Sequence, residues 1–362
     1  MSGTGPMKLD VMLKQGVADG IYPGAVLLVA RGDKILFFES VGQANLLTGA
    51  PIVKETVFDL ASLTKPLATA MVMMHLVQTG RVAVTSRIAA LLAQFDTPEK
   101  NQITIEHLLC HTSGYPAYQP YFIELNDILK EDRLDRLKTL LVKEPLVSKP
   151  GVNMCYSDLG FMVLAWVGET ICKKSLPAVV KERIYQPLGI ETLFFPDYQS
   201  PSRDVEFAAT EDCPWRQRTL VGTVHDDNAC TVNGLPGHAG LFGDAESVYK
   251  LLWRLMQTYH QEASLAGIST KVVRLFLTSC KIGGRARGFD IPSMIDSAGG
   301  SYFSDNSVGH LGFTGTSFWM DLQNRMIIIF LTNRVHPSRN NEAIKTFRPK
   351  LHDCAMRQFR AI

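Results

Sequence analysis

The sequence has no apolar stretch long enough to cross a membrane. Its longest candidate, Met326 to Leu331, falls far short of the roughly 18 residues that a span needs, and it is predicted to be a buried strand. An excess of one charge is also lacking, because 37 basic residues face 35 acidic ones for a formal net charge of +2. This balance predicts neither a nucleic-acid partner nor a membrane partner. Glycine-rich phosphate-binding motifs are missing as well, and no cofactor is expected.

Cysteine motifs are equally sparse. The chain has no C-x-x-C, and an odd number of cysteines argues against a closed disulfide framework. Reduced, mostly buried thiols in a cytosolic protein are therefore expected. The N-terminal stretch, residues 1–17, has no continuous apolar core and no small-residue cleavage site, so it predicts no secretory signal and a cytoplasmic location. The seven cysteines are scattered singly, at Cys110, Cys155, Cys172, Cys213, Cys230, Cys280 and Cys354.

Two hairpins are predicted near the two ends of the chain. Ala25 to Ala30 and Ile35 to Phe38 flank a polar turn, and Thr316 to Leu322 and Arg325 to Thr332 flank another at Gln323-Asn324. A helix is expected to follow, from about Asn341 to Phe359, and the middle of the chain is mostly helical. The pattern predicts an α/β fold of the α+β type. Its one antiparallel sheet is formed by the N- and C-terminal segments, flanked by helices and accompanied by an all-helical region.

The segment from Ser62 to Thr79 is predicted to be a single buried helix, because it is apolar on every side and is followed by Gly80. Ser62 and Lys65 stand at its start, three residues apart and therefore on one face. A serine is a weak nucleophile until a base takes its proton, and a lysine serves as that base only if its pKa is lowered. We expect burial of Lys65 to lower it.

Taken alone, this spacing has a plain alternative, in which Ser62 caps the helix and Lys65 lies at the surface. Two later segments favour the catalytic interpretation. Tyr156 precedes the apolar helix Leu159 to Val167, and its hydroxyl could relay protons if the fold brings it beside Lys65. The plain alternative is a core tyrosine with Ser157 or Asp158 as the helix cap, and the cap is the role expected for Asp158. A glycine-rich strand, residues 309–317, leads into the terminal hairpin.

These three segments together resemble the serine β-lactamase-related family, which comprises class C β-lactamases, D,D-peptidases and family VIII esterases. Ser62-Leu63-Thr64-Lys65 matches its S-x-x-K motif, Tyr156-Ser157-Asp158 is similar to its Y-x-N motif, and His310-Leu311-Gly312 to its K-T-G strand with histidine in place of lysine. Two further stretches, residues 103–114 and 237–242, are similar to bacterial members. The resemblance extends from about Asp10 to Asn333.

The resemblance implies one catalytic domain, residues 8–362. Its α/β lobe covers about 8–62 and 240–362, and its mainly helical lobe about 63–239. It implies Ser62 as the nucleophile that forms an acyl-enzyme, with Lys65 and Tyr156 as the other catalytic residues. His310, Gly312 and Phe313 would bind substrate: Gly312 by letting a substrate approach the strand edge, and Phe313 by pairing its N–H with that of Ser62 as an oxyanion hole.

Two departures from the family pattern bear on the substrate. The lysine charge is replaced by His310, which is largely neutral near pH 7, and the threonine hydroxyl by Leu311, which has no donor. Thr314 and Thr316 are candidates to replace that hydroxyl. A site that loses donors to a carboxylate discriminates against carboxylate-bearing substrates. Small carboxylic esters are therefore favoured, with an ester or amide small molecule as the partner and the oligomeric state left open.

Two alternatives stay open. One is a D,D-peptidase or weak β-lactamase, and the other is a non-catalytic binding or scaffold protein that keeps the fold. The intact Ser62, Lys65 and Tyr156 argue against a scaffold. No metal site is predicted: residues 224–228 and His238 match no common metal-binding spacing, and side-chain hydrogen bonds are the expected role of that loop. Four aromatic residues are candidates to line an acyl pocket: Tyr115, Tyr118, Tyr121 and Trp319.

Overall fold

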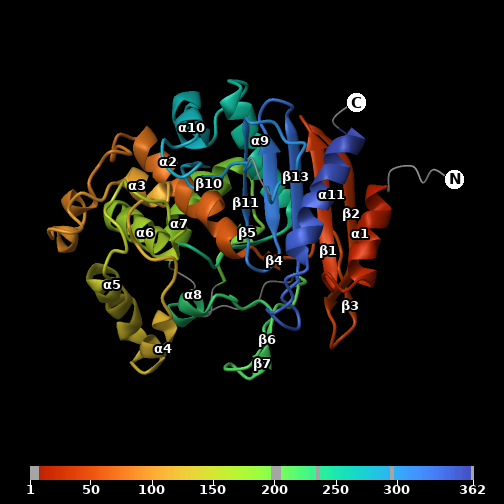
Figure 1. Cartoon of the computed structure of the whole chain (residues 1–362), viewed down its shortest axis with the longest axis horizontal. Coiled ribbons are helices and arrows are strands. Elements are labelled where there is room, and N and C mark those ends of the chain that lie inside the picture. Colours follow the sequence, from red (N-terminus) through yellow and green to blue (C-terminus); the bar gives the residue numbers. More distant parts are fainter. Residues whose placement is uncertain (1–7, 197–204, 234–236, 294–296, 360–362) are drawn as a thin grey trace.

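The fold is built around an eight-stranded sheet in which every neighbouring pair is antiparallel (Figure 1). The computed structural model describes residues 8–196, 205–233, 237–293 and 297–359. The strand order is β3-β2-β1-β13-β12-β11-β10-β9. These strands are β1 (Gly24–Arg31), β2 (Lys34–Asn45), β3 (Ala50–Pro51), β9 (Arg285–Ala286), β10 (Phe289–Asp290), β11 (Ser307–Leu311), β12 (Ser317–Asp321) and β13 (Met326–Thr332).

Strands from near the two ends of the chain lie side by side in this sheet, as predicted for a sheet formed by the N- and C-terminal segments. Strand β1 pairs with β13 in antiparallel register, with Ala25 opposite Thr332 and Arg31 opposite Met326. Both predicted hairpins are confirmed, as β1–β2 and β12–β13. Nearly every residue of β1 and β13 is buried, because helices cover both faces of the sheet and an unbroken apolar run then fits better than alternation.

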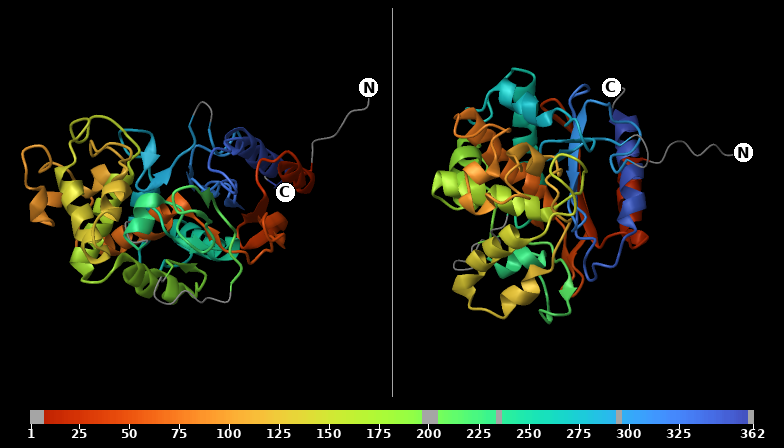
Figure 2. Two further views of the ribbon diagram at one scale, coloured as in Figure 1. Left: turned by 90° about the horizontal axis from the view of Figure 1, so that it is seen from below. Right: turned by 60° about the vertical axis from the view of Figure 1, so that its left-hand side comes forward.

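The helices lie in two layers around the sheet (Figure 2). Helices α1 (Leu9–Ala18) and α11 (Ile344–Phe359) pack together on one face, and α9 (Ala245–Tyr259) lies against β13 and β1 on the other. Side chains of β13 alternate accordingly, with Ile328 in the cluster under α1 and α11 and Ile327 in the main core. None of the helices in the described ranges has both the length and the apolar character of a membrane span.

Most of the remaining helices and short strands lie on the side of the sheet that α9 covers. They surround the start of helix α2 there. The helices are α2 (Ala70–Gln78), α3 (Ile105–Leu109), α4 (Tyr121–Asn126), α5 (Arg133–Lys143), α6 (Asp158–Cys172), α7 (Leu176–Val180), α8 (Asp227–Thr231) and α10 (Thr270–Leu277). The short strands are β4 (Phe58–Asp59), β5 (Leu193–Phe194) and β8 (Phe242–Gly243) in one small sheet, and β6 (Asp212–Cys213) and β7 (Arg218–Thr219) in another.

The predicted single helix from Ser62 to Thr79 is three pieces. A 3-10 turn over Ala61–Leu63 leads into a π-helical turn over Lys65–Thr69, and the α-helix proper is α2. Pro66 has no N–H to donate to the first turn, which favours a change of winding at this point. Wide turns of this kind often accompany functional sites. The expected burial is confirmed, since residues 65–74 are all buried.

The expectation of free thiols is wrong for two cysteines. Cys110, directly after α3, forms a disulfide with Cys280, 170 residues later, with their Cα atoms 6.4 Å apart. An odd count excludes complete pairing but does not exclude a single bridge, so the sequence argument was too broad. The bridge fastens the helical region to the segment that precedes β9. The free cysteines in the described part of the chain are Cys155, Cys172, Cys213, Cys230 and Cys354.

We therefore predict that the unfolded, non-reduced protein takes up an alkylating reagent at five cysteines and the reduced protein at seven. Intact-mass measurement after alkylation in denaturant counts them. Peptide mapping of the non-reduced sample should recover Cys110 and Cys280 in one cross-linked pair. Alkylation of all seven cysteines without reduction would show that the bridge does not form.

Candidate active site

Ser62 lies on a tight turn that is held by buried hydrogen bonds. Ala61, just before it, has a φ of +47°, a left-handed conformation that costs a non-glycine residue about 1–3 kcal/mol. The buried carboxylate of Asp59 accepts from the Ala61 N–H at 2.9 Å, and the Thr64 hydroxyl donates to the Ala61 carbonyl at 2.6 Å. These bonds stabilise the turn that carries Ser62. Asp59 and Thr64 were not among the predicted site residues.

The Lys65 ammonium group is completely buried, and each of its three protons has an acceptor. It donates to Ser62 Oγ at 3.0 Å, to Asp158 Oδ1 at 2.7 Å and to the His238 carbonyl at 3.0 Å. The expected contact between Lys65 and Ser62 is therefore present. The other two acceptors come from the start of α6 and from the segment before β8, so three separate parts of the chain meet at one nitrogen.

The charge state of Lys65 differs from the expectation. Burial lowers its pKa, but the negative charge of Asp158, with a contribution from Tyr156 and hydrogen bonds to both, raises it more. The pKa of Lys65 therefore lies above its ordinary value, and the resting protein carries an ammonium there. Burial was the right cause, but the sequence did not show that a carboxylate would lie against this lysine.

Asp158 was expected to cap α6, and this expectation is wrong. Ser157 is the cap, since its Oγ accepts from the Gly160 N–H at 3.3 Å. Asp158 turns instead toward Lys65 in an ion pair, with 18% of its side chain exposed. An unpaired buried ammonium is far more costly than an uncapped helix end. The Asp158 carboxylate therefore offsets more desolvation cost beside Lys65 than it would as a helix cap. The signal in the sequence was the aspartate at the third position of the Y-x-N motif.

Tyr156 lies beside Lys65 as predicted, with its ring centroid 5.0 Å from the Lys65 Nζ. The ring is held between His111, at a centroid distance of 4.5 Å, and the guanidinium of Arg285, at 4.9 Å. Burial raises the pKa of Tyr156, while the charge of Lys65 and contacts with the Lys65 and Ser62 side chains lower it by less. The hydroxyl thus holds its proton at neutral pH and can donate it.

The segment after β11 is bound to the residues just before Ser62. Thr314 donates to the Asp59 carbonyl at 2.7 Å and Thr316 to the Leu60 carbonyl at 3.1 Å, and both threonines are buried. These hydroxyls cannot replace the one missing at Leu311. A Cβ on Gly312 would lie 2.0 Å from the Thr316 hydroxyl and 2.7 Å from the Leu60 carbonyl. Gly312 therefore serves the protein's own packing, and its role in substrate approach stays a prediction.

His310 and Phe313 lie at the two ends of this connection. His310 is buried, and its Nδ1 is 2.8 Å from the Leu311 carbonyl. Burial, together with the charges of Lys65 and Arg285, lowers its pKa to about 4 against the opposing effect of Asp290. Phe313 is 50% exposed and its ring stacks on His225. Its N–H as an oxyanion donor stays a prediction.

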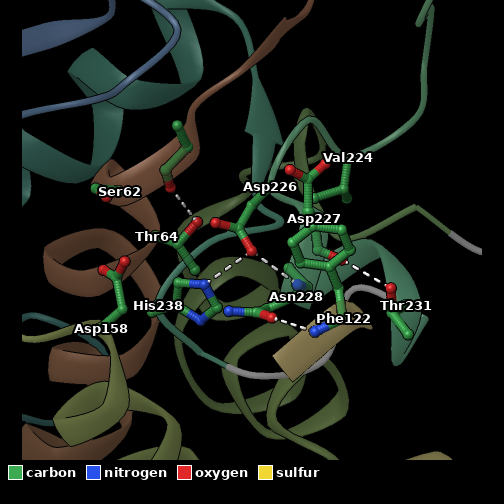
Figure 3. A network of polar contacts seen from close by, with 12 residues as sticks. Ser62, Thr64, Phe122, Asp158, Val224, Asp226, Asp227, Asn228, Thr231 and His238 are labelled. Carbon is green, nitrogen blue, oxygen red and sulfur yellow. Dashed lines mark hydrogen bonds and ion pairs between the residues drawn. The ribbon is translucent and has the colours of Figure 1, made fainter. Parts of the chain in front are cut away.

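The loop around residues 224–228 is held by side-chain hydrogen bonds, as expected, but it also reaches the site (Figure 3). Asp226 Oδ1 lies 2.9 Å from His238 Nε2 and accepts from the Ala229 N–H at 2.7 Å. Burial raises the pKa of Asp226, but the charge of His238 and the hydrogen bonds to the carboxylate lower it by more. The pKa of Asp226 therefore lies well below its usual range. Asp158, Asp226 and His238 bring one potential metal ligand each within 4.8 Å of one another. The Lys65 ammonium, bound to Asp158, already supplies a positive charge there.

Of the four aromatic residues considered for an acyl pocket, only Tyr118 is still a candidate. It is 43% exposed, and the charges of Asp226 and Asp158 act on its hydroxyl. Tyr115 and Tyr121 are buried and bonded to Leu141 and Glu144. Trp319 packs on Gly309 and Phe303, on the face of the sheet that α11 covers.

The comparison with protein families decides the relationship. The Beta-lactamase family matches residues 9–350. The chain belongs to this family. An N-acetylmuramyl-L-alanine amidase of Bacillus subtilis is 30% identical, over 91% of this chain and 81% of its own length. A putative D-alanyl-D-alanine carboxypeptidase of Escherichia coli is 29% identical, over 91% of this chain and 82% of its own length.

Solved structures agree on the fold. EstCE1, described as a hydrolase with promiscuous acyltransferase activity, superposes with a TM-score of 0.73 at 20% identity, covering 94% of this chain and 97% of EstCE1. At that identity the likeness shows the fold alone. The family match and the relatives of 29–30% identity, named as an amidase and a putative carboxypeptidase, place the chain among the serine hydrolases related to β-lactamases.

The lowered pKa of His310 predicts a pH-dependent loss of stability. Because the folded protein favours neutral His310, its contribution is present above the ordinary histidine pKa of about 6.5 and is lost as the pH falls toward 4. Between pH 7 and pH 5 this one group should lower the free energy of unfolding by about 2 kcal/mol. Urea unfolding of wild type and His310→Gln at both pH values measures it. An equal pH dependence in the two proteins would show that His310 is not held neutral.

Proposed function

We propose that this protein hydrolyses small carboxylic esters through an acyl-enzyme at Ser62. The observation that carries the proposal is the fully buried Lys65 ammonium, 3.0 Å from Ser62 Oγ, at the start of a buried helix. A charge in that position is costly, and a purely structural role gives no reason to keep it next to a serine hydroxyl. It is the arrangement that an activated nucleophile needs.

In this proposal Ser62 Oγ attacks the ester carbonyl carbon and passes its proton to Lys65 once that amine is free. The negative charge that develops on the carbonyl oxygen is stabilised by the N–H groups of Ser62 and Phe313. As the ester bond breaks, the Tyr156 hydroxyl gives its proton to the leaving alcohol and recovers one from Lys65. Water then repeats the sequence on the acyl-enzyme, which releases the acid.

The preference for esters rests on groups around β11. His310 has a pKa of about 4 and is therefore neutral at pH 7, so it brings no positive charge. The side chain of Leu311 has no donor, and the hydroxyls of Thr314 and Thr316 are bonded to backbone carbonyls. A substrate carboxylate therefore lacks the partners that a lysine and a threonine would give it. Each such hydrogen bond is worth roughly 1.5–3 kcal/mol.

A second candidate is hydrolysis of an amide bond in a cell-wall-derived peptide. It is favoured by the relatives of 29–30% identity, which are named as an amidase and a putative D-alanyl-D-alanine carboxypeptidase. The cytoplasmic location expected above stays a proposal. The Cys110–Cys280 disulfide argues against it, because such bridges persist in oxidising compartments.

The test compares a p-nitrophenyl ester of a short acid, a peptide ending in D-Ala-D-Ala and a penicillin. We expect kcat/KM for the ester to exceed the values for the two carboxylate-bearing substrates by at least about tenfold, the effect of one lost hydrogen bond to a charge. Steady-state kinetics on the purified chain measure the ratio. Ser62→Ala should lose at least about 10³-fold in kcat with all three substrates.

Leu311→Thr is the matched variant, because it returns one donor to the strand. It should raise kcat/KM for the penicillin relative to the ester. Efficient penicillin or peptide turnover by the unmodified protein would contradict the ester assignment and favour the second candidate. Retention of a tenth of the ester activity by Ser62→Ala would contradict the nucleophile assignment.

A further inference from the structure

The hydrogen bonds of Lys65 leave a gap in the proton path. Its nitrogen donates to three acceptors, one of which is Ser62 Oγ itself. An ammonium with three donated bonds has no lone pair, so it cannot take the Ser62 proton as it stands. Some other group must first receive a proton from Lys65.

The Asp158 carboxylate is the acceptor that the geometry provides. It lies 2.7 Å from Lys65 Nζ, the shortest of the three contacts. The His238 carbonyl is a neutral peptide oxygen and Ser62 is the group to be deprotonated, so neither can store the proton. We propose that Asp158 takes a proton from Lys65 when substrate binds and so frees the amine to act on Ser62. This rests on the proposed function, in which Lys65 is the base.

Bound substrate drives the proton transfer from Lys65 to Asp158 by burying the pair. Asp158 is 18% exposed, so water still reaches its carboxylate in the resting site. A substrate over Ser62 excludes that water, and loss of solvation disfavours the charged forms of both partners. The ammonium and carboxylate then become amine and carboxylic acid by transfer of one proton across one hydrogen bond. The charge of the pair is unchanged, and the proton returns when product leaves.

Other groups around Lys65 do not offer the same path. Tyr156 holds its own proton, because burial raises the pKa of its phenol. The Asp226 carboxylate is bonded to His238 and the Ala229 N–H, whereas Lys65 donates to Ser62, Asp158 and the His238 carbonyl. Among the described residues, the titratable groups that act on Lys65, or on which Lys65 acts, are Tyr156, Asp158, Asp226, His111 and His310. Those near the Asp158 carboxylate also include His238 and Tyr118.

The test is the pH dependence of kcat/KM for a neutral p-nitrophenyl ester in wild type and Asp158→Asn. In wild type, activity should fall on the acid side only when Asp158 itself is protonated, since the pair then carries two protons. In Asp158→Asn, Lys65 must lose its proton to solvent. The acid limb should therefore move at least one unit to higher pH, with activity recovering at alkaline pH.

Two variants control for charge and for structure. Asp226→Asn removes a nearby carboxylate that does not contact Lys65, and its acid limb should move by less than half of the shift in Asp158→Asn. Asp158→Glu keeps the acceptor and should keep the wild-type limb, even if kcat falls. An unmoved or lowered limb in Asp158→Asn, or an equal shift in Asp226→Asn, would overturn the proposal.

If Asp158→Asn turns over no ester, a second measurement still tests the proposal. The rate at which a fluorophosphonate labels Ser62 follows activation of the serine alone, and its pH dependence should show the same upward shift of the acid limb. Labelling with the wild-type pH dependence would overturn the role of Asp158. If Ser62→Ala were labelled as fast as wild type, the nucleophile assignment would fail instead, so the two failures are distinguishable.

Discussion

An ammonium group with no exposed surface has to find all its hydrogen-bond acceptors inside the protein, and Lys65 finds three on three separate segments. Leaving such a charge unpaired would cost several kcal/mol, so the start of α6 and the segment before β8 are held where their oxygens meet it. The same contacts bring Tyr156 and Asp158 to Ser62. The need of the buried Lys65 ammonium for hydrogen-bond acceptors thus brings the residues of the site together.

The sheet supplies the other half of this arrangement. Hydroxyls of Thr314 and Thr316 donate to carbonyls of Asp59 and Leu60, and Gly312 leaves the space for that approach. The end of β11 is therefore fixed relative to the turn that carries Ser62. Because both sides of the nucleophile are bound to buried, rigid elements, its position does not depend on exposed loops, which is the arrangement that precise catalytic geometry needs.

Sequence reasoning was most successful where the signal was local. Hairpins follow from turn residues between apolar runs, and the contact of Ser62 with Lys65 follows from their spacing of three. It failed where the deciding partner was distant in sequence. Asp158 lies 93 residues from Lys65, and only the fold shows that its carboxylate pairs with an ammonium rather than a helix end. The raised pKa of Lys65 and the Cys110–Cys280 bridge were missed for the same reason.

The central claim is that the Lys65 contact activates Ser62, and covalent trapping tests it most directly. The purified chain is treated with a fluorophosphonate, digested, and mapped by tandem mass spectrometry. We expect a single adduct on Ser62 and its loss in Lys65→Ala, which keeps the serine but removes the base. An adduct on another serine, or equal labelling of Ser62 without Lys65, would contradict it.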